Sequence, residues 1–138
     1  MKQKVIYWVL TGVFSAMMLF AAYSYFTDET IKGAFVHLGF PDYFRIELAT
    51  AKLFGAAALL IPLVPRALKN FAYAGFTINL VSAVIAHLSL GDPMSAWLPP
   101  LVFLGVLVGS FISYQKVIAT KRPELKPNEE LSYLSEAR

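Results

Sequence analysis

The sequence predicts an all-α membrane protein, a transmembrane bundle of four helices, from three observations. Hydrophobic residues make up 57% of the chain and charged residues 15%, whereas soluble domains average about 45–50% and about 25%. The apolar residues gather in four blocks, each close to the roughly 20 residues that a helix needs to cross a bilayer. Most of the charged residues fall in the segments between these blocks. The lack of cysteine excludes a disulfide framework and an iron–sulfur cluster within the chain.

The first block, residues 5–26, contains no charged residue. It is longer than the roughly 7–15 residues of a signal-peptide core, so we expect a retained helix, although Ala22-Tyr23-Ser24 would allow cleavage. Aromatic residues near both ends fit the belts found at the two surfaces of a membrane: Tyr7, Trp8, Tyr23, Tyr25 and Phe26.

The long connection after this helix contains an amphipathic segment, residues 31–40. This segment mixes aromatic and aliphatic side chains with Lys32 and His37. It is too short to span a membrane, so we expect it to lie on the outer membrane surface or to fold over the bundle. Gly39 and Pro41 are expected to end it.

The other three predicted helices are residues 46–64, 71–90 and 97–114. Residues that favour turns separate them: Pro62, Pro65 and Gly91-Asp92-Pro93. We therefore divide the chain into a membrane domain, residues 1–114, and a polar cytoplasmic tail, residues 115–138.

The distribution of lysine and arginine predicts the orientation, because cytoplasmic segments carry an excess of both. One side of the predicted bundle holds most of them: Lys2, Lys4, Arg66, Lys69, Lys116, Lys121, Arg122 and Lys126. The opposite side holds only Lys32 and Arg45. Both termini are therefore predicted to be cytoplasmic. Since the basic residues flank apolar blocks and form no basic stripe, we expect no binding of nucleic acid.

Four polar side chains fall inside the predicted spans: Glu47, Lys52, Asn79 and His87. A charge at the centre of a bilayer costs at least about 2.5–3.5 kcal/mol, so such residues are candidates for function. With a rise of about 1.5 Å per residue, Glu47 and His87 lie at nearly the same height, and Glu47 is predicted to orient His87. Lys52 has no acid on its own helix face, so we expect its partner on the helix of residues 71–90, in the outer loop or in a ligand.

The predicted helix of residues 71–90 has one polar face. Successive positions four residues apart on it are Gly75, Asn79, Ala83 and His87, and Ser82 flanks them. We expect this face and Lys52 to surround a shared cavity that opens toward the outer surface.

Each of these residues also has a purely structural interpretation. Glu47 and His87 could be solvated residues at helix ends or a plain interhelical pair. Lys52 could extend its long side chain to the membrane surface. Asn79 could join two helices by a hydrogen bond, as amides commonly do in membranes.

Four glycines are predicted to permit close helix packing: Gly55, Gly75, Gly105 and Gly109. Gly105, Gly109 and Ser113 also form a stripe of small residues that could serve a homo-oligomer. Packing inside the bundle is the interpretation that we favour for this stripe.

Several chemistries are not supported by any motif. A P-loop, a zinc-ligand spacing and a GxSxG elbow are missing, so the sequence assigns no catalytic residue, and we predict no metal ligand. His37 and His87 are the only histidines. We disfavour haem ligation by this pair, because His37 is expected in a flexible loop.

Several short stretches together resemble the DoxX-like family of small four-helix membrane proteins. They are residues 40–44, 51–56, 65–66, 71–76, 86–87 and 91–93, within a resemblance that covers roughly residues 36–112. The resemblance implies a bacterial or archaeal cytoplasmic membrane and a link to quinone-dependent redox complexes. It adds Asp92 to the candidate ligand-binding residues, since Lys52, His87 and Asp92 are the motif residues at the polar site.

Two classes of function are therefore open. The first is a redox-associated membrane subunit that binds a small amphipathic or quinone-like molecule and has an oxidoreductase as its partner subunit. The second is a non-enzymatic membrane scaffold whose polar residues only fix the helices. A small transporter or channel subunit is less favoured, because four short helices leave little room for alternating access. In each case we expect contact with lipid and no enzyme activity from this chain on its own.

Overall fold

A computed structural model describes residues 2–121 and 127–137, and all regular structure in these ranges is helical. The helices are α1 (Lys2–Thr27), α2 (Glu29–His37), α3 (Asp42–Leu60), α4 (Arg66–Ser89), α5 (Met94–Lys121) and α6 (Pro127–Glu136). The all-α prediction is confirmed.

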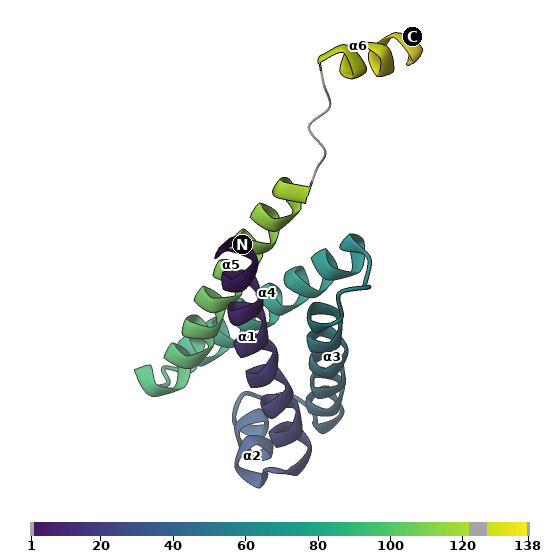
Figure 1. Cartoon of the computed structure of the whole chain (residues 1–138). Helices are drawn as coiled ribbons and strands as arrows, with labels where there is room; N and C mark the ends of the chain where they lie inside the picture. The colour runs from purple at the N-terminus through teal and green to yellow at the C-terminus, as the bar shows by residue number, and fades with distance from the viewer. Residues whose placement is uncertain (1, 122–126, 138) are drawn as a thin grey trace.

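The four long helices close a ring. α1 packs against α3 and α5, and α4 packs against the other sides of the same two helices. The short helix α2 lies at one end of this ring, against α1 and α3 (Figure 1). The start of α1 and the turn between α3 and α4 lie at the opposite end (Figure 1).

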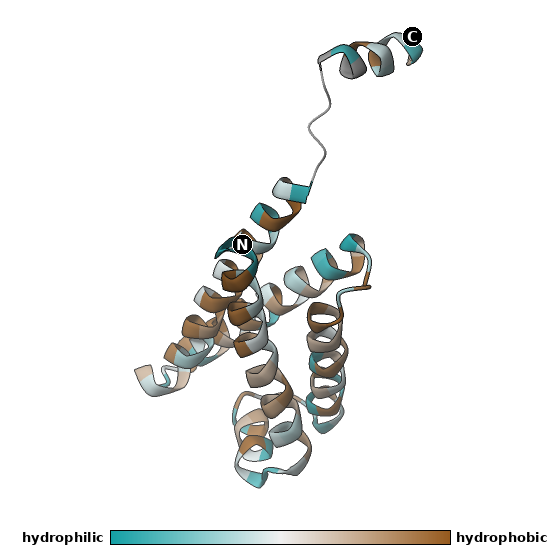
Figure 2. Cartoon of the chain, viewed as in Figure 1, coloured by the Kyte–Doolittle hydropathy of each residue, from teal (hydrophilic) through white to brown (hydrophobic). Residues whose placement is uncertain are grey.

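Three of the helices, α1, α4 and α5, are long and apolar enough to cross a membrane. α3 differs from them in composition, because Asp42, Arg45, Glu47 and Lys52 all fall within its 19 residues. Many large hydrophobic side chains of the apolar helices are exposed, and much of the ribbon of these helices has the brown of hydrophobic residues in Figure 2. Such surfaces are typical of helices that contact lipid, since lipid leaves no reason to bury apolar groups.

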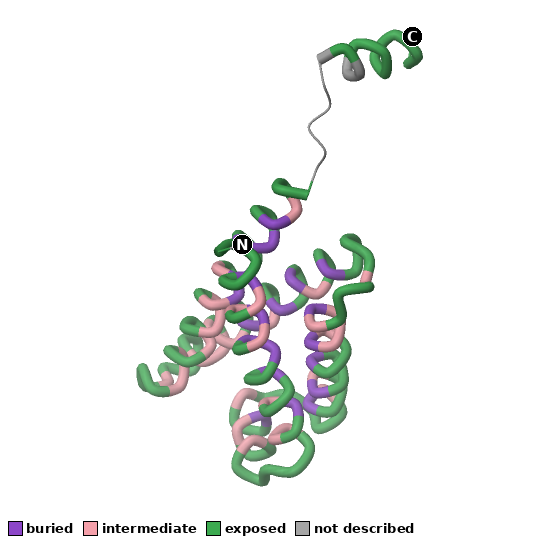
Figure 3. Tube along the Cα trace, in the orientation of Figure 1, coloured by how far each residue is buried: buried purple, intermediate pink, exposed green. Residues whose placement is uncertain are grey.

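The core lies along the inner line where the helices meet (Figure 3). Phe14 and Met18 from α1, Leu59 from α3 and Leu107 from α5 are almost completely buried. The ring of Phe14 contacts that of Phe76 on α4 edge to face, with centroids 5.0 Å apart. Phe14 therefore packs at the centre of the ring of helices.

Buried hydroxyl groups add a hydrogen-bonded cluster to this core. The Ser110 hydroxyl on α5 lies 2.6 Å from that of Thr11 on α1 and 2.7 Å from that of Tyr73 on α4. Because a hydroxyl both donates and accepts, the three groups satisfy one another. Three helices are thereby joined at one height.

Helix boundaries differ from the predicted ones where caps decide them. α3 begins at Asp42 because Pro41 is extended and serves as its N-cap, and it ends at Leu60 because Ile61 is extended. α5 begins at Met94, so that Pro99 and Pro100 lie in its second turn, and it continues to Lys121. The last part of α5 thus occupies residues that we had assigned to the polar tail.

The predicted amphipathic segment forms α2 and the turn that follows it. Asp28 caps the helix by accepting a hydrogen bond from the Thr30 amide at 2.8 Å. The helix ends at His37, and Gly39 turns the chain with a φ of +83°, which a residue with a side chain adopts at a cost. α2 folds over the end of the bundle and buries Phe35.

Two of the four predicted packing glycines meet a neighbouring helix. A Cβ on Gly55 would lie 2.7 Å from the Phe76 ring, and one on Gly109 would lie 3.3 Å from Leu10. Gly75 and Gly105 have no such neighbour within 4 Å. The structure therefore corrects the interpretation of Gly75 and Gly105, which have open space beside them where a helix was expected.

Helix α6 makes no contact with the other helices described. Residues 122–126, which belong to the predicted tail, lie outside the described residues.

Candidate functional site

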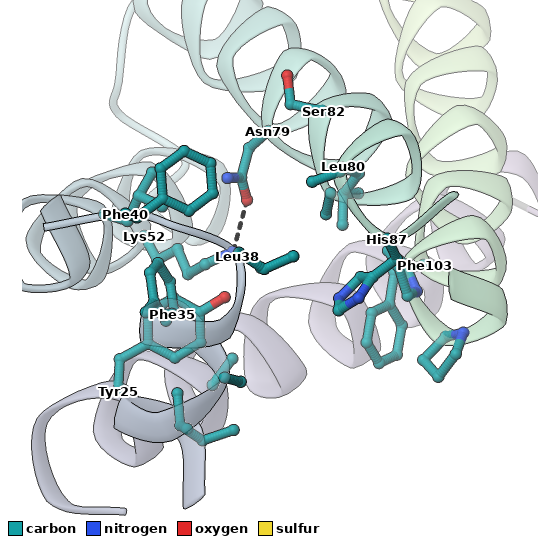
Figure 4. Close-up of a pocket in the computed structure, with 18 of the residues that line it drawn as sticks. Tyr25, Phe35, Leu38, Phe40, Lys52, Asn79, Leu80, Ser82, His87 and Phe103 are labelled. Carbon is teal, nitrogen blue, oxygen red and sulfur yellow. Dashed lines mark hydrogen bonds between the residues drawn. The ribbon is translucent and has the colours of Figure 1, made fainter. Parts of the chain in front are cut away.

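A cavity of about 350 Å³ lies beneath α2, between the ends of the long helices. Aromatic side chains supply much of its wall, among them Phe35, Phe40, Phe44 and Phe103. Four of the predicted site residues also line it: Lys52, Asn79, Ser82 and His87 (Figure 4). The cavity therefore combines an apolar interior with a few polar groups, as small-molecule sites usually do.

Lys52 reaches the cavity from α3. Only 5% of this residue is exposed. Its ammonium group donates a hydrogen bond to Asn79 Oδ1 at 2.7 Å and approaches Met18 Sδ at 3.8 Å. It also lies 5.4 Å from the centre of the Tyr25 ring. One of the three partners expected for Lys52, a residue of the helix that contains Asn79, is thus present in the structure.

His87 is held by the turn that follows α4. The Gly91 amide donates to the Leu88 carbonyl and the Asp92 amide donates to the His87 carbonyl, which is the Schellman pattern of helix ends. Gly91 has the positive φ, +72°, that this pattern requires. The turn brings the Asp92 carboxylate back to the ring, so that Oδ2 lies 2.7 Å from His87 Nδ1.

Asp92 also holds His37, the last residue of α2. Oδ1 of Asp92 lies 2.9 Å from His37 Nε2. The two histidines hold the pKa of the Asp92 carboxyl below its usual value, the His87 hydrogen bond contributing most. An ionised carboxylate only accepts hydrogen bonds, so each histidine donates to it from one ring nitrogen. The other ring nitrogen of each histidine has no hydrogen bond to the residues described. We call His37, Asp92 and His87 the histidine clasp.

The histidine clasp corrects two predictions. Asp92, and not Glu47, orients His87; Glu47 is exposed and does not line the cavity. The reason is local, because the glycine turn delivers a carboxylate five residues after His87, whereas Glu47 points away from the inner face of α3. His37 is also helical and held in place, not part of a flexible loop.

Two buried basic residues were not recognised as structural in the sequence. Arg45 on α3 bonds the Asp42 carboxylate at 2.9 Å and the Tyr25 carbonyl at the end of α1. Lys69 on α4 donates to the carbonyls of Ala58 and Leu59 at 2.9 and 3.0 Å, where α3 ends. The Asp42–Arg45 spacing of three was the only sequence signal for either role.

A second cavity, of about 540 Å³, runs between α3 and α4. Its walls are apolar except for Lys52 and Asn79, which also line the first cavity. The hydrogen bond between these two residues therefore lies where the two cavities adjoin.

The apolar helices define a membrane protein, and a largely apolar cavity with a few polar side chains lies between them. The profile of the DoxX-like family matches residues 9–110, and the chain belongs to this family. The match includes α1, which the sequence resemblance had left out. No curated protein and no solved structure matches the chain.

The histidine clasp predicts that the docking of α2 depends on pH. Because the pKa of Asp92 is lowered, its carboxylate stabilises the docked α2 above the ordinary carboxyl pKa of about 3.9, and this contribution is lost as the pH falls through the lowered value. Asp92→Asn offers one acceptor in place of two, so α2 should exchange its amide hydrogens faster at neutral pH. Hydrogen-exchange mass spectrometry measures this directly.

Asp28→Asn is the matched control. It removes a carboxylate near the same end of the protein, while Asn remains a good N-cap for α2. Equal exchange in the Asp92→Asn variant and in the parent protein would show that the histidine clasp does not hold α2.

Proposed function

We propose that this protein binds a small amphipathic, quinone-like molecule in the cavity beneath α2, as a redox-associated subunit and not as an enzyme on its own. The observation that carries this proposal is the cavity itself, which places Lys52, Asn79 and His87 among aromatic walls. The apolar body of the ligand would lie against Phe35 and Phe103. Its polar atoms would bind Lys52 and the free ring nitrogen of His87.

The redox association rests on the resemblance to the DoxX-like family. Without cysteine the chain has no thiol chemistry, so electrons would pass through the bound molecule or an oxidoreductase partner subunit. Ser82 lines the cavity, and its hydroxyl would supply a further hydrogen bond.

The proposed setting is the cytoplasmic membrane, crossed four times, with both termini in the cytoplasm. Support for α3 as the fourth span comes from its place in the ring, where it packs against α1 and α4. Its charged residues Arg45 and Lys52 are buried against neighbouring helices, which removes them from lipid. The excess of lysine and arginine at one end of the bundle supports the orientation.

The scaffold is the second candidate, and one observation favours it. The polar residues join different helices: Lys52 bonds Asn79 across α3 and α4, and Ser110 joins α5 to α1 and α4. Such bonds would fix the bundle even if nothing entered the cavity. A homo-oligomer fits either candidate.

Filling the cavity separates the two candidates. Ala83 on α4 lines the cavity, so Ala83→Phe should occupy it. We expect the parent protein, purified from native membranes, to retain a quinone or another small amphipathic molecule detectable by mass spectrometry. The Ala83→Phe variant should lose it and keep its thermal stability, because the new ring fills existing space.

Ala74→Phe is the control, since Ala74 is exposed on the same helix and lines neither cavity. It should retain the molecule. Identical small-molecule contents in the two variants would favour the scaffold.

A further inference from the structure

The surroundings of the Lys52 ammonium group indicate the charge of the ligand, provided that the cavity binds one as proposed above. An ammonium group carries three N–H donors. Those of Lys52 have one strong acceptor, the neutral amide oxygen of Asn79, and one weak one, the sulfur of Met18. No carboxylate among the described residues forms an ion pair with Lys52.

The other charged residues that are buried or partly buried in the described part of the chain are compensated. Arg45 pairs with the carboxylate of Asp42. Lys69 binds two carbonyls at the end of α3, where the helix dipole favours a positive charge. Asp92 accepts from two histidines. Lys52 differs from them in having neither an anion nor a helix terminus as its partner.

A buried charge without a counter-charge is unfavourable, and an anion that enters the cavity would remove this cost. The described lining of the cavity contains no Asp or Glu that would repel an anion. Lys52 and Asn79 lie on one side of it, with Phe35, Phe40 and Leu38 beside them (Figure 4). A ligand whose anionic group lies at Lys52 would therefore place its apolar part directly against apolar side chains of the cavity wall.

We propose that the ligand of this cavity is an amphipathic acid, with a carboxylate or a similar oxyanion that pairs with Lys52 and an apolar chain or ring against the aromatic wall. Asn79 positions the ammonium group for this pairing. The proposed ligands are thereby narrowed to amphipathic molecules that carry a negative charge. This excludes neutral quinones, so electrons would pass through the oxidoreductase partner subunit.

A matched pair of probes tests the charge. Laurate and methyl laurate share one apolar chain, but only laurate carries a charge at neutral pH. We expect the purified parent protein, in a neutral detergent, to bind laurate at least about tenfold more tightly by native mass spectrometry, as hydrogen bonds to charged groups commonly imply. Lys52→Met should abolish this preference. Lys32→Met, which removes an exposed lysine from α2, should keep it.

Each outcome has a separate meaning. Equal binding of the two probes to the parent protein overturns the inference and leaves the proposed binding function intact, and this comparison does not require that Lys52→Met folds. Failure of both probes to bind contradicts the inference and the proposed function together. A preference that survives in Lys52→Met also overturns the inference. Phosphatidylglycerol, added as a competitor, distinguishes the two sources of an oxyanion: it should displace laurate only if the natural ligand is a membrane lipid.

Discussion

Replacing Phe14 with Ala is expected to destabilise the bundle more than any other single truncation. Phe14 is completely buried, and its ring packs edge to face against Phe76. Truncation of a buried Phe costs about 3–5 kcal/mol in soluble proteins, where a lost transfer term adds to the cavity left behind. In a membrane the transfer term is small, because lipid is as apolar as the core. We therefore expect roughly 2–3 kcal/mol, mainly from lost packing.

Thermal unfolding in detergent measures this loss. Phe20→Ala on the same helix is the control, because Phe20 is 70% exposed and its truncation removes mainly contacts with lipid or detergent. An unfolding midpoint in Phe14→Ala equal to that in Phe20→Ala would show that the described core does not hold the bundle together.

The second large effect is expected at Gly55 on α3, against which the Phe76 ring of α4 packs. A Cβ at this position would lie 2.7 Å from the Phe76 ring, so Gly55→Leu must displace that ring. The ring cannot move freely, because Phe14 packs against it. Overpacking of this kind typically costs about 1–3 kcal/mol.

Combining Gly55→Leu with Phe14→Ala in one double variant tests the displacement of Phe76 more sharply. Phe14→Ala opens space beside the Phe76 ring, so the added cost of Gly55→Leu should be smaller in that background. Gly105→Leu is the control, since a Cβ there meets no other atom within 4 Å. Strictly additive losses in the double variant would contradict the described contact between these three residues.

The local composition of the chain accounts for much of what could be foreseen about the fold. Apolar blocks are a local property of the chain, and they revealed the helices α1, α4 and α5 and the all-α class. The amphipathic helix α2 was also foreseen from composition and from its closing glycine. Helix ends were less predictable: the extended residues Pro41 and Ile61 set the bounds of α3, and α5 runs further in both directions than its apolar block.

The candidate site was foreseen only in part. One cavity is lined by four of the predicted residues: Lys52, Asn79, Ser82 and His87. They could be predicted because polar residues are unexpected inside a membrane span, and because a spacing of four places residues on one face of a helix. Glu47 was misassigned, since equal height along two helices does not show whether their side chains face each other.

The sequence by itself determined that this is a helical membrane protein of the DoxX-like family, with polar residues on the inner faces of its helices. These features follow from the local composition of the chain and from the helical spacing of its polar residues. Only the tertiary structure decided the partners: Asn79 for Lys52, the α3 carbonyls for Lys69, and Asp92 between His37 and His87. Partners are set by how helices far apart in the chain rotate and pack, and a pairing between His37 and Asp92, 55 residues apart, leaves no periodic trace in the sequence.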